Sequence, residues 1–332
     1  MKKKSRQIDW YRTPVDREAL AKFNARSDLL GGLQTFGYVG LLFISGGFAW
    51  YAATNHSLYV LLPALFLHGT FYAFMVNGFH ELIHRTVFRT QPLNQIFLWI
   101  FSFSGWYDPV MFWASHKAHH KYTLHPPDDL EVTLPTKITF RSFLKTAIIN
   151  PWAFLDRLRN VYRLSIGRLE GEWVNSLFPP DALQERQRLM WWSRCLLAGH
   201  VLLTAVSIWA GYWMLPVLIT FAPFYGGWLF FLCNNTQHAG LQDNVDDFRY
   251  CTRTIHLNPF VQFLYWHMNF HIEHHMYAAV PCYRLHALHR HIAFDLPNSP
   301  DGLLQAWREI TGILQQQKKD PAYIFVPTVP DA

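Results

Sequence analysis

Histidine is the residue whose spacing points most directly to chemistry in this chain. Eighteen of the 332 residues are histidines, and many of them are clustered. Three clusters have the spacing H-x-x-x-H or H-x-x-H-H: His80 and His84; His116, His119 and His120; and His271, His274 and His275. Residues three or four positions apart share one face of a helix, so each cluster directs two or three imidazoles towards one point.

A fourth element places Asn234 and His238 four positions apart. With it, nine imidazoles are available as metal ligands. Neutral imidazole binds iron, zinc, copper and nickel. A tetrahedral zinc ion takes four ligands, so nine ligands suit two metal ions of higher coordination number. Imidazole alone does not select the element.

Three acidic residues lie close to these clusters in the sequence. Asp128 and Asp129 follow the second cluster, and Glu273 lies inside the third. A carboxylate that accepts the second ring N–H of a ligating histidine orients that ring, so all three are candidates for this role. The alternative for each is a solvated charge. His125, close to Asp128 and Asp129, is a further candidate for a contact behind the ligands. The other histidines outside the clusters, His289 among them, are expected to be ordinary surface or core side chains.

The composition indicates that these histidines belong to a membrane protein. Hydrophobic residues make up 51% of the chain, aromatic residues 17% and charged residues only 16%. Soluble domains carry about 25% charged residues. This composition argues against a disordered chain, a coiled coil or a nucleic-acid-binding module. The four cysteines form no C-x-x-C pair, so neither a disulfide framework nor a cysteine-ligated metal site is indicated.

Four apolar stretches without Asp, Glu, Lys or Arg predict transmembrane helices. They are residues 36–53, 58–79, 196–211 and 215–233. A spanning helix needs about 20 mainly apolar residues. Very short links join the first stretch to the second and the third to the fourth, so the sequence predicts two helical hairpins. The alternative, four large buried helices, is hard to accommodate in a soluble fold of this length.

The distribution of basic residues predicts the orientation in the membrane. Lysine and arginine are concentrated before the first hairpin and between the two hairpins. By the positive-inside rule these segments face the cytoplasm. We therefore expect a single domain, residues 1–332, with three cytoplasmic segments, residues 1–35, 80–195 and 234–332. Both termini and all the histidine clusters then lie on the cytoplasmic side.

Three further segments are expected at the membrane surface. The 11 apolar residues 96–106 are too short to span and are interpreted as dipping into the membrane from the cytoplasmic side. Residues 14–27 and 303–314 resemble amphipathic surface helices. The predicted fold is an all-α integral membrane protein with four transmembrane helices in two hairpins, interfacial or re-entrant helices, and a cytoplasmic helical cap that carries a histidine-rich di-metal site.

The order and spacing of the clusters resemble the membrane fatty acid desaturase superfamily. Residues 269–281 are similar to its third histidine-box signature, and His238 with Asn234 is similar to an additional ligand pair in acyl-desaturases. The resemblance covers roughly residues 35–295. It implies two ferrous ions with O2 as co-substrate, nine histidine ligands, a water-mediated role for Asn234, and no catalytic residue beyond the ligands. The nine ligands are His80, His84, His116, His119, His120, His238, His271, His274 and His275.

The resemblance also implies an activity and partners. The expected reaction introduces a double bond into a fatty-acyl or lipid-like chain. The same scaffold also supports hydroxylases and ketolases that act on lipids, carotenoids or small amphiphiles. No fused electron-transfer domain is expected, so a separate donor of the ferredoxin or cytochrome b5 type, with its reductase, would supply electrons. No nucleic acid is expected as a partner.

Two alternatives come from other classes of protein. Residues 80–84 also match the zinc-peptidase pattern H-E-x-x-H, with Glu81 as the general base and Asp243 as a possible third ligand. That hypothesis leaves seven clustered histidines unexplained. A haem-binding or metal-transport protein would instead need ionisable residues along the spans. The predicted spans offer few of these, mainly His68 and His200.

Overall fold

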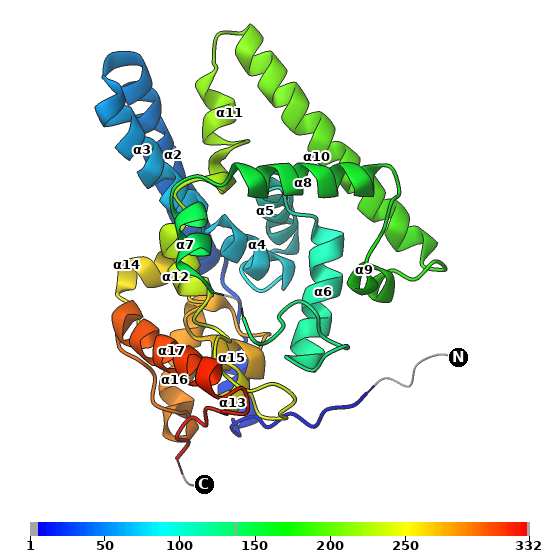
Figure 1. The fold of residues 1–332 in the computed structure, drawn as a ribbon, viewed down its shortest axis with the longest axis vertical. Helices are drawn as coiled ribbons and strands as arrows, with labels where there is room; N and C mark the ends of the chain where they lie inside the picture. Colours follow the sequence, from blue (N-terminus) through cyan, green and yellow to red (C-terminus); the bar gives the residue numbers. More distant parts are fainter. Residues whose placement is uncertain (1–5, 137, 331–332) are drawn as a thin grey trace.

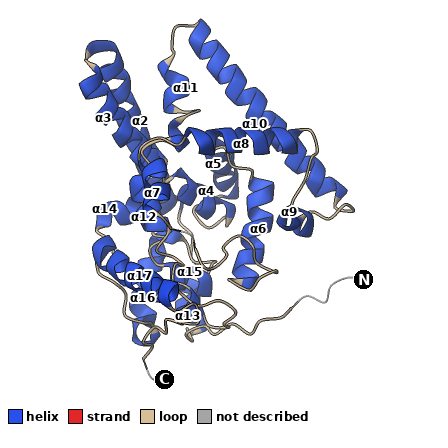
Figure 2. Ribbon diagram, in the orientation of Figure 1, coloured by secondary structure: helices blue, strands red, loops and turns tan. Residues whose placement is uncertain are grey.

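The computed structural model describes residues 6–136 and 138–330. The regular structure of these residues is helical, and the only β-structure among them consists of three isolated bridges (Figure 2). The predicted all-α class is therefore confirmed. Three helices or helix pairs are long and apolar enough to cross a membrane, namely Arg17–Asn55, Leu58–Ile83 and Leu183–Trp209.

The first predicted hairpin is present, formed by α2 (Asp28–Asn55) and α3 (Leu58–Tyr72) (Figure 1). Helix α2 begins eight residues before the apolar stretch does, because the side chain of Ser27 accepts a hydrogen bond from the Leu30 amide and caps the helix there. After a short break at residues 73–74 the chain continues as α4 (Met75–Ile83). The first histidine cluster therefore lies at the end of a candidate membrane-spanning segment.

The prediction of a second hairpin with two continuous helices is wrong for its second member. Helix α10 (Leu183–Trp209) starts 13 residues earlier than the apolar stretch. Residues 215–233, however, are divided among α11 (Met214–Leu218), η1 (Ala222–Phe224) and α12 (Trp228–Asn234). The sequence reason is visible afterwards: Pro223 lies in the break, and Gly226 takes the left-handed conformation (φ +69°) that favours glycine.

Side chains from α3 and from the turn after α5 (Gln91–Ser104) bind the backbone of this broken segment. The carbonyl oxygen of Leu218 lies 3.0 Å from His68 Nε2. The carbonyl of Ile219 accepts from the Tyr72 hydroxyl at 3.2 Å, and that of Thr220 accepts from the Trp106 indole at 2.9 Å. Non-helical backbone is tolerated at membrane depth only where the protein satisfies it. These three donors replace the missing helical hydrogen bonds.

The other helices surround the histidine clusters or lie beside them. Helix α1 (Arg17–Phe23) is shorter than the predicted helix at residues 14–27, because Asp16 caps it. Helix α5 (Gln91–Ser104) contains most of the short apolar stretch and packs against α4. The second cluster lies on α6 (Pro109–Tyr122) and the third on α15 (His271–Met276). The predicted helix at residues 303–314 is confirmed as the longer α17 (Gly302–Lys319).

The remaining helices complete the chain. They are α7 (Phe140–Ala147), α8 (Pro151–Ser165), α9 (Glu172–Leu177), α13 (Phe248–Cys251), α14 (Pro259–Leu264), α16 (Cys282–Ile292) and η2 (Ala293–Asp295). In Figure 1 the hairpin, α11 and α10 extend to one end of the molecule, and α4, α6 and α15 lie below them. The fold thus has two parts, namely an elongated helical part and a part that carries the histidines.

Candidate metal centre

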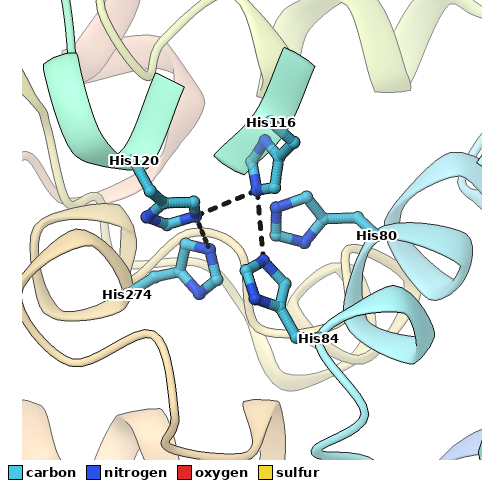
Figure 3. A group of neighbouring side chains, drawn as sticks. All are labelled: His80, His84, His116, His120 and His274. Carbon is cyan, nitrogen blue, oxygen red and sulfur yellow. Dashed lines mark hydrogen bonds between the residues drawn. The ribbon is translucent and has the colours of Figure 1, made fainter. Parts of the chain in front are cut away.

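The nine predicted histidines form two groups in space. In group A are His80, His84, His116, His120 and His274 (Figure 3). In group B are His119, His238, His271 and His275. Within each group, one nitrogen from every residue lies within 4.8 Å of the others. All nine side chains are buried or half-buried.

Helical spacing explains how one cluster serves both groups. On α6, His116 and His120 are one turn apart and face group A, whereas His119 faces group B. On α15 the division is reversed, because His271 and His275 face group B and His274 faces group A. Helix α4 contributes to group A alone. Helices α6 and α15 are therefore the two helices that contribute to both groups.

The Nε2 atoms of neighbouring histidines face one another. In group A, His116 Nε2 lies 3.1 Å from His84 Nε2 and 2.9 Å from His120 Nε2, and the latter lies 3.1 Å from His274 Nε2. In group B, His271 Nε2 lies 3.0 Å from His238 Nε2 and 3.2 Å from His275 Nε2. Each contact is a hydrogen bond if one of the two Nε2 atoms carries a proton, and a repulsion between lone pairs if neither does.

Three carboxylates fix the tautomers of three imidazoles. Each accepts the Nδ1–H of one histidine: Glu81 from His80 at 3.0 Å, Glu131 from His116 at 2.9 Å, and Asp129 from His119 at 2.8 Å. A neutral imidazole that donates through Nδ1 has a lone pair on Nε2. In their neutral form these three rings therefore present lone pairs to the centre.

Two neutral acceptors do the same for two rings of group B. His238 Nδ1 lies 2.8 Å from the carbonyl oxygen of Cys251, which can only accept, so Nδ1 must carry the proton. His275 Nδ1 lies 3.2 Å from the Thr123 hydroxyl oxygen. That hydroxyl already donates its proton to the His119 carbonyl at 2.7 Å, so it accepts from His275.

At least five of the nine imidazoles thus direct Nε2 lone pairs into the two groups. Lone pairs that converge at such short range repel one another unless a cation lies between them. Outward hydrogen bonds that fix the ring and leave the inner nitrogen free are what metal-ligating histidines show. The donor set therefore fits two metal ions, with nitrogen as the only ligand atom that the histidines supply.

Burial keeps these imidazoles neutral. It lowers the pKa of His84 and the pKa of His238 to about 3. Burial also lowers the pKa values of five others well below the ordinary value, namely those of His116, His120, His271, His274 and His275. Neutral imidazole is the form that binds metal.

His119 is the exception. Burial acts to lower its pKa, but the hydrogen bond and negative charge of Asp129 outweigh burial and raise the pKa of His119 above its ordinary value. Burial likewise acts to raise the pKa of Asp129, and the bond from His119 outweighs it and lowers that pKa. His119 and Asp129 thus form a charge-assisted contact behind group B.

The other predicted polar residues differ in their burial and in their hydrogen bonds. Asp129 is buried against His119, whereas Asp128 is half-buried and its amide donates to the His125 carbonyl at 3.0 Å. The side chain of Asn234 is exposed and makes no hydrogen bond to a histidine among the described contacts. Its water-mediated role stays a prediction.

The prediction that Glu273 orients a ligand imidazole is wrong. Its carboxylate accepts from the Thr254 hydroxyl at 2.6 Å and from His289 Nδ1. A residue two positions from His271 and from His275 lies on the opposite side of the helix, so Glu273 faces away from group B. His289, expected to be an ordinary side chain, is its partner on α16.

Three of the groups that orient histidine rings have no recognisable signal in the sequence. Glu131 and Thr123 lie near the second cluster, but nothing in their spacing distinguishes them from other polar residues. The Cys251 acceptor is a backbone carbonyl, which no side-chain pattern can reveal. In the sequence, Glu81 stands out only as part of the pattern H-E-x-x-H. It lies behind His80 on the Nδ1 side, and Asp243 is exposed, so the residues do not form a peptidase site.

Comparison with known protein families identifies a match. The sequence model of the family described as fatty acid desaturase matches residues 56–305, about three quarters of the chain and all nine histidines. No curated protein matches the chain significantly.

Proposed function

Because the chain belongs to the fatty acid desaturase family, we propose that it is an O2-dependent oxidoreductase that introduces a double bond into a fatty-acyl or lipid-like chain. The metal centre would be two iron ions held by the nine histidines of groups A and B. The observation that carries this proposal is the pair of adjacent groups of buried imidazoles with converging lone pairs. Two groups with shared helices suit chemistry that needs two metal ions side by side.

The reaction needs an oxidant that no side chain provides. Bound iron would supply it by activating O2, so that hydrogen can be removed from an unactivated C–H bond. In the net reaction, two neighbouring CH2 groups, O2, two electrons and two protons give a CH=CH unit and two water molecules. The protein's own residues hold the ligands in place and exclude water.

Aromatic side chains pack against the imidazoles and help to exclude water. The ring of Phe112 stacks on His116 with centroids 5.1 Å apart, and Phe248 lies 5.4 Å from His275. Phe248 is fully buried. Low solvent access protects a strongly oxidising centre from side reactions. These rings therefore serve the chemistry although they bind no metal.

The position of the centre favours a lipophilic substrate. Helix α4, which carries His80, continues the candidate span Leu58–Ile83. The exposed surface of α2 and α3 is rich in large apolar side chains, such as Phe43, Ile44 and Tyr59. A substrate dissolved in the bilayer would reach the histidines without crossing water.

The proposal includes the orientation and the partners. Both termini and the metal centre would face the cytoplasm, as the basic segments indicate. Electrons would come from a separate carrier of the ferredoxin or cytochrome b5 type, with its reductase.

Lipid analysis tests the proposed reaction. Lipids from cells that express the wild-type chain, His119→Ala or His56→Ala are compared by mass spectrometry, with a ferredoxin and its reductase co-expressed. We expect a product lighter by two hydrogens with the wild type and with His56→Ala, whose histidine lies at the exposed tip of the hairpin, but not with His119→Ala. A product heavier by one oxygen would instead indicate a hydroxylase.

A further inference from the structure

The N-terminal segment contacts the ends of both helices that serve the two histidine groups. We call residues 8–15 the strap. It lies outside the family match at residues 56–305. In Figure 1 it is the dark-blue chain along the lower edge of the molecule, beside α13. It has no regular helix, and Tyr11 forms an isolated bridge with Asp247.

Two strap side chains donate hydrogen bonds to carbonyl groups at equivalent positions of α6 and α15. The Trp10 indole Nε1 donates to the carbonyl oxygen of Lys121 at 2.9 Å. The Arg12 Nε donates to the carbonyl oxygen of Met276 at 2.7 Å. Lys121 directly follows His120, and Met276 directly follows His275. Each H-x-x-H-H helix is therefore bound at the residue after its paired histidines, where helix carbonyls lack an intrahelical partner.

Further contacts fix the strap itself. Trp10 is buried and stacks on Phe248 with ring centroids 4.1 Å apart and planes 7° from parallel. The hydroxyl of Tyr11 and that of Thr13 both donate to the buried Asp295, at 2.8 and 2.6 Å. Arg249 pairs with the same carboxylate and lies 4.0 Å above the Tyr11 ring. The two donors are thus held by a rigid segment.

From these contacts we infer that the strap is a positioning element of the metal centre, which sets the spacing between groups A and B. Helices α6 and α15 are the two that contribute histidines to both groups. Any shift of one helix against the other therefore changes both groups at once. The strap joins the ends of these helices through Trp10 and Arg12, two positions apart in the chain. This inference rests on the proposed function only in requiring that the histidines bind metal.

Metal binding by a double variant tests the inference. Trp10→Phe with Arg12→Met removes both donors but keeps an aromatic ring against Phe248 and an unbranched side chain at position 12. The control is Trp307→Phe with Arg284→Met, which removes an indole-to-carbonyl bond at Leu232 and an arginine-to-carbonyl bond at Ala25. Both double variants lose the same kinds of hydrogen bond, but only those lost in Trp10→Phe with Arg12→Met involve α6 and α15.

The probe is Co²⁺ added to the metal-free, detergent-solubilised full chain. Visible absorption gives the binding isotherm, and electron paramagnetic resonance reports magnetic coupling between two bound ions. We expect the wild type and the control to bind two Co²⁺ per chain as a coupled pair. In the strap variant the second ion should bind at least about 10-fold more weakly, which is the loss of affinity typical when a contact behind the metal ligands is removed. The magnetic coupling between the two ions should also be lost.

The outcomes are separable. A strap variant with the wild-type isotherm and coupling would overturn the inference and leave the proposed function intact. A wild-type chain that binds no Co²⁺ would overturn the metal centre itself. If circular dichroism shows that the double variant does not fold, Arg12→Met alone decides, because Arg12 is exposed and its loss leaves Trp10 in place. Restoring a donor with Arg12→Lys should recover part of the affinity.

Discussion

At the scale of single residues, the outward hydrogen bonds of the histidines distinguish this site from a chance cluster. Asp129 is the clearest case, because it is fully buried and accepts from His119 Nδ1 at 2.8 Å. Asp129→Asn removes the charge, and its amide can present a donor to Nδ1 instead. We expect metal affinity in group B to fall 10- to 100-fold, measured as iron per chain after dialysis. Asp243→Asn, at an exposed position, should leave the iron content unchanged.

Glu81 separates the proposed activity from a peptidase at the same scale. In Glu81→Gln the amide oxygen can still accept from His80 Nδ1, so the ring keeps its tautomer. We expect the variant to retain desaturase activity within about a factor of 10 of the wild type. Glu81→Ala, which leaves the buried Nδ1–H without a partner, should lose far more. If Glu81→Gln and Glu81→Ala inactivated the enzyme equally, Glu81 would have a chemical role beyond the orientation of His80.

At the scale of elements, the sequence predicted helices where one physical signal dominated. Continuous apolar runs identified α2 and α3, and i, i+3, i+4 spacing placed the clusters on α4, α6 and α15 correctly. The same signal failed at residues 215–233, because apolarity does not report whether the backbone is helical. The contacts that stabilise that broken segment are long-range, because His68, Tyr72 and Trp106 lie more than 100 positions away in the sequence. The contacts of Trp10 and Arg12 were equally out of reach, since they join residues more than 100 positions apart.

The broken segment gives a prediction of its own. His68 is buried, and its two ring nitrogens bond to Ser45 at 2.9 Å and to the Leu218 carbonyl at 3.0 Å. His68→Leu leaves that carbonyl without a donor inside an apolar region, which costs about 1–3 kcal/mol. The unfolding temperature in detergent should fall accordingly. His56→Leu, at the exposed end of the hairpin, is the control, and an equal loss there would argue against the backbone contact as the cause.

At the scale of the whole molecule, burying so many neutral imidazoles makes the metal-free protein sensitive to acid. His238 has a pKa of about 3 when folded because it is buried, whereas an unfolded histidine has a pKa of about 6.5. The unfolded chain therefore binds more protons, so stability is retained above pH 6.5 and falls as the pH decreases towards 3. At pH 5 each such histidine should reduce the free energy of unfolding by about 2 kcal/mol.

The measurement is the unfolding midpoint of the metal-free chain between pH 8 and pH 5, compared with that of His238→Gln. The variant lacks the titrating group, so its midpoint should fall less steeply with acid. Parallel curves for the two chains would show that His238 is not buried in the neutral form.

The central claim is that two iron ions are held side by side by histidines from α6 and α15. Mössbauer spectroscopy of the purified chain reconstituted with ⁵⁷Fe²⁺ tests it most directly, since it reports the number, ligand type and coupling of the ions. The proposal predicts two nitrogen-rich ferrous sites per chain, with His120→Ala perturbing mainly the five-histidine group and His119→Ala mainly the four-histidine group. A single iron site per chain, or spectra unchanged by both substitutions, would contradict it.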